Sequence, residues 1–218
     1  MLSLFYTDLN STVKDELLLD CLPLTMQREI VRFKSHKAMR AALWGKILLL
    51  AGLNYCGCPP TVINSYGRSK NGRPFLKGIP FDFNISHSGD LVVVVFSNDK
   101  VGVDVEQIQF LDINDFDLVF NGTERKSINN NLSKLFKLWT IKEAVMKADG
   151  RGFGLHPSKI EVQGAKVSVK NSGDVWYYHH ISLDPRYVLT VAADKPWIKD
   201  DLKITFIQNI TPELCSKK

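Results

Sequence analysis

The chain has 218 residues, enough for one large domain or two small ones. Hydrophobic residues make up 44% and charged residues 23%, which is typical of a globular protein and excludes a disordered, collagen-like or coiled-coil chain. The longest apolar runs are too short to span a bilayer, and the N-terminal segment lacks the basic leader and apolar core of a signal peptide. We therefore expect a cytoplasmic protein with no membrane partner.

The net charge of +5 is unevenly distributed along the chain. Basic side chains are concentrated in residues 26–46, and acidic side chains in residues 99–124. One basic and one acidic region in a small protein suggest a phosphate site beside a metal site. The alternative is that both are ordinary solvated faces.

The first half of the chain predicts a strand, a long helical stretch and further strands. Leu2–Tyr6 reads as the first strand, and Pro23–Leu53 has apolar residues at helical spacing. If that helix is unbroken, a set of basic residues follows one another at i+4 on one face: Arg28, Arg32, His36 and Arg40. The later strands are expected at Phe81–Ile85, Leu91–Phe96 and Val101–Glu106.

The segment Val101–Glu106 alternates apolar residues with polar or small ones. Because side chains at i and i+2 of a strand share a face, its valines point into a core, and Asp104 and Glu106 point together to the other side. Two carboxylates so placed repel each other unless a cation lies between them. The alternative is a pair of carboxylates on a solvent-exposed face.

The second half predicts two helical stretches followed by strands. The helices are expected at Asp115–Ser127 and Leu132–Asp149. The strands are expected near Lys159–Val162, Val167–Lys170, Tyr177–Leu183, Tyr187–Ala192 and Thr205–Gln208. Each half thus offers a helix followed by antiparallel strands. We expect an α+β fold of two similar subdomains, residues 1–106 and 107–218, each a helix packed on a small antiparallel sheet.

The helix 132–149 carries the clearest chemistry. Trp139, Glu143 and Lys147 lie at i, i+4 and i+8, so they line one face. Read alone, Glu143 and Lys147 form an exposed ion pair. Together with Asp104 and Glu106, however, Glu143 completes an oxygen ligand set suited to Mg²⁺, and Lys147 is one turn away from it, within reach of a phosphate.

Two further segments carry candidate phosphate ligands. The strand expected near residue 85 is followed by a polar segment that contains Ser86 and His87. Arg73 lies in an Asn-Gly-Arg-Pro turn. Adjacent residues on a strand point to opposite faces, so Ser86 and His87 are poorly placed to act as a nucleophile and its base. This argues against a serine hydrolase.

Four segments occur together and in order: GRPFL (72–76), FNISHSG (83–89), VGVDVE (101–106) and WTIKEAVMKADGRGFG (139–154). In this combination the chain resembles the 4′-phosphopantetheinyl transferases, in particular the long, pseudodimeric Sfp type, over roughly residues 20–195. The resemblance implies two similar α+β halves with the active site between them. It also implies transfer of 4′-phosphopantetheine from coenzyme A to a serine of an acyl, peptidyl or polyketide carrier protein. It further implies that the reaction requires Mg²⁺ and releases adenosine 3′,5′-bisphosphate, and that a monomer suffices.

The resemblance also assigns roles to residues. It implies metal binding by Asp104, Glu106 and Glu143, with Glu143 also the base for the acceptor serine. It places Lys147 on the phosphates of coenzyme A. The residues expected to hold the nucleotide and its 3′-phosphate are Arg73, Ser86, His87, Lys37 and Arg40, with Arg28 and Arg32 as weaker candidates. Lys142 lies in the same motif without a defined role.

Two competing functions remain from the sequence. One is a coenzyme A- or carrier-binding module of the same fold that has lost catalysis, against which the intact set Asp104, Glu106, Glu143 and Lys147 argues. The other is a nucleic-acid binder, whose interleaved basic and aromatic residues are missing from the sequence. A kinase that uses ATP is disfavoured because the sequence has no Walker A glycine loop.

Overall fold

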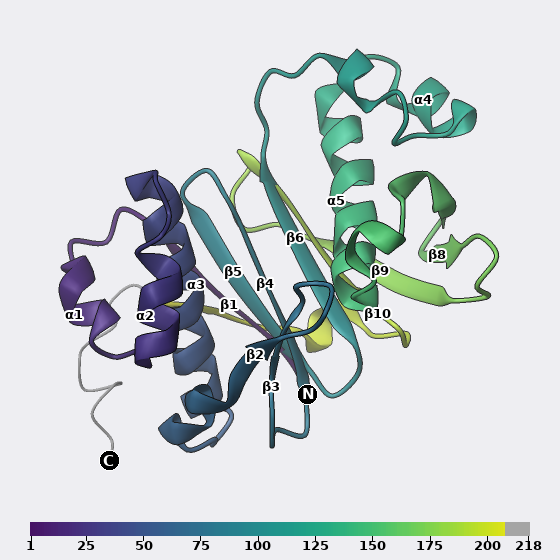
Figure 1. Cartoon of the computed structure of the whole chain (residues 1–218). Coiled ribbons are helices and arrows are strands. Elements are labelled where there is room, and N and C mark those ends of the chain that lie inside the picture. The colour runs from purple at the N-terminus through teal and green to yellow at the C-terminus, as the bar shows by residue number, and fades with distance from the viewer. Residues whose placement is uncertain (208–218) are drawn as a thin grey trace.

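The computed structural model describes residues 1–207, apart from the side chains of residues 114 and 153. The chain forms two helix-on-sheet halves, with α3 packed on one sheet and α5 on the other (Figure 1). This confirms the predicted α+β fold. Within residues 1–207, no helix has the length and apolar character needed to cross a bilayer.

The N-terminal half is built on a four-stranded sheet in the order β11-β1-β5-β4, in which β11 is parallel to β1 and the other pairs are antiparallel. Its strands are β1 (Leu2–Asp8), β4 (Asp82–Ser88), β5 (Leu91–Ser97) and β11 (Lys203–Phe206). Its helices are α1 (Asp15–Leu19), α2 (Leu24–Ile30) and α3 (His36–Tyr55), and a small hairpin consists of β2 (Tyr66–Arg68) and β3 (Pro74–Leu76).

The C-terminal half is built on a five-stranded antiparallel sheet in the order β6-β10-β9-β8-β7. Its strands are β6 (Val101–Gln107), β7 (Ile160–Gln163), β8 (Lys166–Val169), β9 (Val175–Ile181) and β10 (Tyr187–Ala193). Its helices are α4 (Gly122–Ile128) and α5 (Leu132–Asp149). Short 3₁₀ helices cover Pro60–Ser65, Ile113–Phe116, Gly152–Gly154, Pro157–Lys159 and Lys199–Asp201.

The boundary predicted after Glu106 falls inside β6, one residue before its end. β6 pairs with β10 in the C-terminal sheet, whereas β11 crosses back and extends the N-terminal sheet beside β1. Gln208, the last residue of the expected strand Thr205–Gln208, lies outside the described residues. Hydrophobic alternation identifies a strand but not its neighbours, so it could not assign β6 and β11 to their sheets.

The helix boundaries follow from capping residues. The predicted helix Pro23–Leu53 is in fact α2 and α3, because Ser35 caps α3 by accepting the Ala38 N–H at 3.4 Å. α5 has the predicted bounds: the Asn131 side chain caps its start, and Gly150, at φ +78°, ends it in the left-handed conformation that glycine tolerates. The predicted helix Asp115–Ser127 is likewise split, because Asn121 starts α4 with a capping box.

Buried apolar residues pack on both faces of the two sheets. α3 covers one face of the N-terminal sheet, where its Trp44 belongs to the same buried cluster as Phe96 of β5, and α5 covers the C-terminal sheet through residues such as Val145. The opposite faces of the two sheets pack against each other. As predicted, the β6 valines lie in this middle layer, and all of them are fully buried: Val101, Val103 and Val105.

The halves also join along β4 and β6, through side chains instead of a backbone ladder. Every second residue of β4 points a side-chain oxygen at a backbone N–H of β6. The pairs run from Val101 N to Asp82 (3.0 Å), Val103 N to Asn84 (3.0 Å), Val105 N to Ser86 (3.3 Å) and Gln107 N to Ser88 (3.1 Å). This alternation fixes the register between the halves. It also explains why positions 82, 84, 86 and 88 of β4 are polar.

Gly102 sets the distance between β6 and α5. A Cβ at this position would lie 2.0 Å from the Ala144 carbonyl oxygen and 2.6 Å from the Ala148 nitrogen, both backbone atoms of α5. Neither atom can move unless the helix moves. The glycine therefore allows the close packing that brings the acidic side of β6 against α5.

Gly102→Ala is expected to destabilise the protein by at least about 1–3 kcal/mol, the usual cost of overpacking a dense core. Thermal unfolding followed by circular dichroism should show the midpoint falling by several degrees. Gly122→Ala at the start of α4, where an added Cβ meets nothing within 4 Å, serves as the control and should cause no loss. Equal midpoints for Gly102→Ala and the wild type would refute this account of the packing.

Candidate active site

The candidate residues Ser86, Asp104 and Lys147 meet where β4, β6 and α5 come together. The Lys147 ammonium on α5 lies 2.6 Å from Asp104 Oδ1 on β6 and 2.9 Å from Ser86 Oγ on β4. Ser86 in turn donates to Asp104 Oδ1 at 3.1 Å. One lysine thus connects all three elements, and through them both halves of the molecule.

Three carboxylates, Asp104, Glu106 and Glu143, interact electrostatically near the single cation Lys147. Asp104 is 2% exposed, so it does not lie on a solvent face, and its second oxygen, Oδ2, has no hydrogen-bond partner among the described residues. Burial raises the pKa of Glu143, and the charges of Asp104 and Glu106 raise it further, against the opposing effect of Lys147. Burial also raises the pKa of Glu106, although hydrogen bonds from Ser88 and Trp139 oppose that shift.

This set fits a divalent cation in its chemistry, although the carboxylates are not gathered around a common point. No group of three His, Cys, Asp or Glu side chains within residues 1–207 is close enough to hold a metal ion as it stands. Lys147 occupies one oxygen of Asp104, while the buried Oδ2 accepts no hydrogen bond from any residue that the structure describes. An unpartnered buried carboxylate oxygen is costly unless it acquires a cation or a donor, so Asp104 Oδ2 fits the role of a ligand.

Ser86 and His87 point to opposite sides of β4, as the sequence predicts. Ser86 is buried and faces Asp104, whereas His87 faces α3 and lines a pocket of about 210 Å³ there. Burial and the nearby Lys147 charge lower the pKa of His87. The two side chains therefore do not form a nucleophile and base, which agrees with the argument against a serine hydrolase.

The pocket beside His87 holds two basic residues that sequence reasoning missed as site residues, Lys46 and Arg68. Lys46 is 6% exposed, donates to the Tyr66 hydroxyl and lies 3.8 Å from the centroid of that ring. Burial lowers the pKa of Lys46 to about 8 and raises that of Tyr66 to about 12. A charged residue inside the apolar run Leu43–Leu50 was the available signal.

A second pocket, of about 330 Å³, lies on the α5 side of β4. It is lined by Glu143, Met146 and Lys147 from α5 and by the turn before β3. Pro74 and Ile85 line both this pocket and the one beside His87, so the two pockets are neighbours. Together they lead from a basic pocket to the carboxylate cluster.

The predicted basic residues of the N-terminal half are not gathered at this site. Lys37 forms an exposed ion pair with Asp90 at 2.8 Å. Arg40 pairs with Asp15 at 3.1 Å and donates to the Ser11 carbonyl at 2.9 Å, which ties down the N-terminal segment. Because α2 and α3 are separate helices, the basic residues expected at i+4 do not share one helix face; these are Arg28, Arg32, His36 and Arg40.

Two residues of the motifs make contacts inside the protein. Arg73 donates to backbone carbonyls at the end of α5 and pairs with Asp82. Lys142 is fully buried and pairs with Glu124 at 3.0 Å, so its position in the α5 motif reflects packing between α5 and α4. Residue type alone could not show that these cations already have acceptors within the protein.

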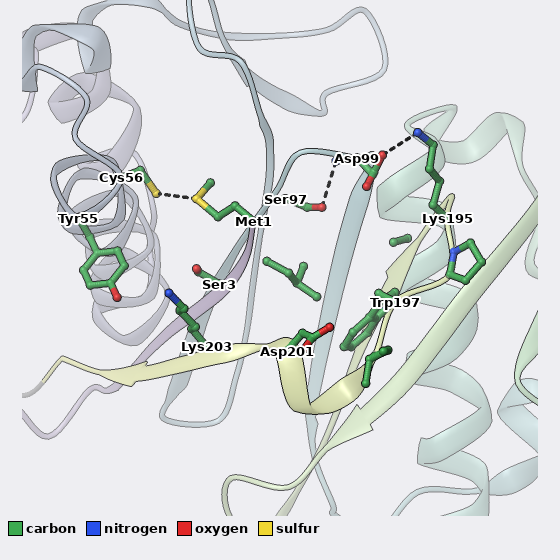
Figure 2. Close-up of a pocket in the computed structure, with 14 residues that line it drawn as sticks. Met1, Ser3, Tyr55, Cys56, Ser97, Asp99, Lys195, Trp197, Asp201 and Lys203 are labelled. Atoms are coloured by element: carbon green, nitrogen blue, oxygen red, sulfur yellow. Dashed lines mark hydrogen bonds and ion pairs between the residues drawn. The ribbon is translucent and has the colours of Figure 1, made fainter.

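A larger cavity, of about 580 Å³, lies near the start of β6, at the opposite end of that strand from Glu106 (Figure 2). Its lining includes Tyr55, Cys56 and Trp197, and its Lys195 is paired with Asp99 at 3.0 Å. None of the predicted site residues lines it. Volume alone does not identify the active site, and the candidate site remains at the carboxylate cluster.

Comparison with known proteins agrees with the resemblance carried by the motifs. The family described as "4'-phosphopantetheinyl transferase superfamily" matches residues 100–192, and "4'-phosphopantetheinyl transferase, N-terminal" matches residues 11–99. The two matches meet at residues 99 and 100, in the turn between β5 and β6.

Curated relatives carry the same description. The chain is 28% identical to the 4'-phosphopantetheinyl transferase psf-1 of Bacillus pumilus, over 84% of this chain and 83% of the relative. It is 35% identical to the 4'-phosphopantetheinyl transferase gsp of Aneurinibacillus migulanus, over 58% of this chain and 55% of the relative. It is 26% identical to the 4'-phosphopantetheinyl transferase Sfp of Bacillus subtilis (strain 168), over 66% of this chain and 70% of the relative.

Proposed function

The chain belongs to the 4′-phosphopantetheinyl transferase superfamily and is an enzyme of that kind, and from this premise we propose the reaction in full. It transfers 4′-phosphopantetheine from coenzyme A to a serine hydroxyl of an acyl, peptidyl or polyketide carrier protein. The observation that carries the proposal is the Lys147 ammonium, held between Asp104 and Ser86 at the junction of the two halves.

The bonds change as follows. The serine oxygen attacks the pantetheine-side phosphorus of the pyrophosphate, and the bond from that phosphorus to the bridging oxygen breaks. Adenosine 3′,5′-bisphosphate leaves, and the serine proton passes to the Glu143 carboxylate. A carboxyl group whose pKa is raised by burial is a stronger base than an exposed one, so Glu143 suits this role.

The other residues bind and orient the substrate. Lys147 places positive charge beside the transferred phosphoryl oxygens, and the pocket lined by Lys46 and His87 takes the anionic nucleotide portion. Arg68 in this pocket is already ion-paired with Glu29. We do not assign Arg40 to the 3′-phosphate, because its guanidinium is used by Asp15 and Ser11. Lys37, exposed beside Asp90, stays a candidate for that contact.

The residues that would hold Mg²⁺ are Asp104, Glu106 and Glu143, with the unpartnered Asp104 Oδ2 as the supporting observation. When bound, Mg²⁺ supplies charge neutralisation on the phosphoryl oxygens. We further propose that the protein is cytoplasmic and acts as a monomer. A monomer suffices because one chain contributes both β4 and the β6–α5 pair to the site.

Mass spectrometry tests this function directly. Purified apo carrier proteins of the fatty-acid, polyketide and peptide classes are incubated with the protein, coenzyme A and Mg²⁺. We expect a gain of one phosphopantetheine on at least one carrier, and no gain with EDTA. No gain on any carrier, with coenzyme A binding retained, would favour a catalytically inactive binding module of the same fold.

A further inference from the structure

The turn between β2 and β3, residues 69–73, reaches from the N-terminal half to the C-terminal end of α5. In Figure 1 this hairpin crosses the front of the molecule towards the lower end of that helix. The Asn71 side chain donates to the Gly150 carbonyl at 3.0 Å. The Asn71 carbonyl packs against Gly152, where a Cβ would lie 3.1 Å from it. The 69–73 turn is therefore fitted to the end of α5.

Arg73 makes further contacts with the end of α5. One terminal nitrogen, Nη1, donates to the carbonyls of Lys147 and Ala148, the latter at 2.5 Å. These carbonyls belong to the last turn of α5, where backbone acceptors have no partner within the helix. The partial negative charge at a helix C-terminus also favours a cation there. Arg73 thus caps α5 from another part of the chain.

The second terminal nitrogen of Arg73 connects this cap to β4 and β6. Nη2 pairs with Asp82 Oδ2 at 2.5 Å and donates to the Val101 carbonyl at 3.0 Å. Asp82 Oδ2 also accepts the Val101 N–H at 3.0 Å. Asp82 begins β4 and Val101 begins β6, so one guanidinium joins the starts of both strands to the end of α5.

Gly150 makes room for this arrangement. Besides adopting φ +78° at the end of α5, it leaves space for the arginine side chain, because a Cβ there would lie 2.9 Å from Arg73 Cδ. With 16% of its side chain exposed and both terminal nitrogens already bonded inside the protein, Arg73 has little capacity left for a phosphate.

We propose that Arg73 is a positioning residue that holds the end of α5 against β6, so that the Lys147 ammonium stays at Asp104 and Ser86. This rests on the proposed function for its catalytic consequence. It differs from the role implied by the family resemblance, in which Arg73 binds the nucleotide. Lysine could not replace it, because one ammonium cannot reproduce the planar set of donors that reaches α5, Asp82 and Val101 together.

The test compares Arg73→Lys with the wild type by steady-state kinetics and by hydrogen exchange without substrate. Misplacing catalytic groups by about 1 Å costs about 10²-fold in rate, so we expect kcat to fall by about that factor while KM for coenzyme A changes little. We also expect faster amide exchange confined to residues 146–150. Lys70→Met, which removes an exposed charge from the same turn, is the control and should leave both measurements unchanged.

The opposite pattern would overturn the proposal: a raised KM for coenzyme A with unchanged kcat and unchanged exchange, as expected for a substrate contact. Should Arg73→Lys not fold, Asn71→Ala removes only the bond to Gly150 and should still raise exchange at the end of α5. Unchanged exchange in that variant would equally count against the proposal. Absence of transfer by the wild type would refute the proposed function, while the exchange experiment would still decide whether the turn holds α5.

Discussion

Glu143→Gln should lower the rate of phosphopantetheine transfer by about 10²–10⁴-fold, the range associated with loss of a general base. The substitution keeps the shape of the side chain and removes its ability to accept the serine proton. Burial and the charges of Asp104 and Glu106 raise the pKa of Glu143 by more than Lys147 lowers it, so loss of the Glu143 charge should leave the fold no less stable than in the wild type. Initial rates with a responsive carrier protein and thermal unfolding measure the two effects.

Two comparisons make this result specific. Glu161→Gln on β7 removes a glutamate that pairs with Lys170 at 2.9 Å, away from the site, and should transfer at the wild-type rate. Coenzyme A binding, measured by calorimetry, should survive in Glu143→Gln, because Lys46, Arg68 and His87 are unchanged. A Glu143→Gln variant with normal turnover would show that another group takes the serine proton.

The parts of the fold that depend on local signals could be predicted from the sequence. α5 has its predicted bounds because Asn131 and Gly150 cap a regular apolar pattern. The long N-terminal helix was predicted as one piece because its apolar period continues through the break, and only the Ser35 cap marks the separation. The apolar period favours one continuous helix there, but the structure has two helices, and the second begins at the Ser35 cap.

The site could be predicted in its residues but only partly in its contacts. Alternation in β6 correctly placed Asp104 on the face opposite the valines. That this face is buried depends on β4 and α5, which are distant in sequence, so a solvent-exposed pair was an equally good reading of the pattern. The same limitation applies to the basic residues. Arginine is a good phosphate ligand, yet Arg40 and Arg73 are already paired with Asp15 and Asp82 inside the protein. The buried Lys46, in contrast, lines a pocket.

Lys142 illustrates how a residue within a catalytic motif can serve the fold. Its ammonium is fully buried, pairs with Glu124 at 3.0 Å and donates to the carbonyls of Pro157 and Ile160 at 3.0 and 2.7 Å. Glu124 also accepts the Asn121 N–H that closes the α4 capping box. Lys142 therefore connects α5 to the start of α4 and to the segment that leads into β7.

Lys142→Met is expected to destabilise the protein by about 3–5 kcal/mol, because it leaves the Glu124 carboxylate buried without its cation. Against a total of about 5–15 kcal/mol for a typical domain, this is a large loss. Urea unfolding should show a lower midpoint, and Lys134→Met on the exposed side of α5 should not.

The double variant Lys142→Met/Glu124→Gln separates the loss of the ion pair from the loss of the lysine's own packing. Removing the stranded charge should restore part of the stability, giving a coupling of about 0.5–3 kcal/mol between the two positions. The folded fraction of Lys142→Met should bind coenzyme A normally, because Lys142 faces Glu124 and not the pockets beside β4. Wild-type stability combined with weakened coenzyme A binding would instead make Lys142 a substrate contact.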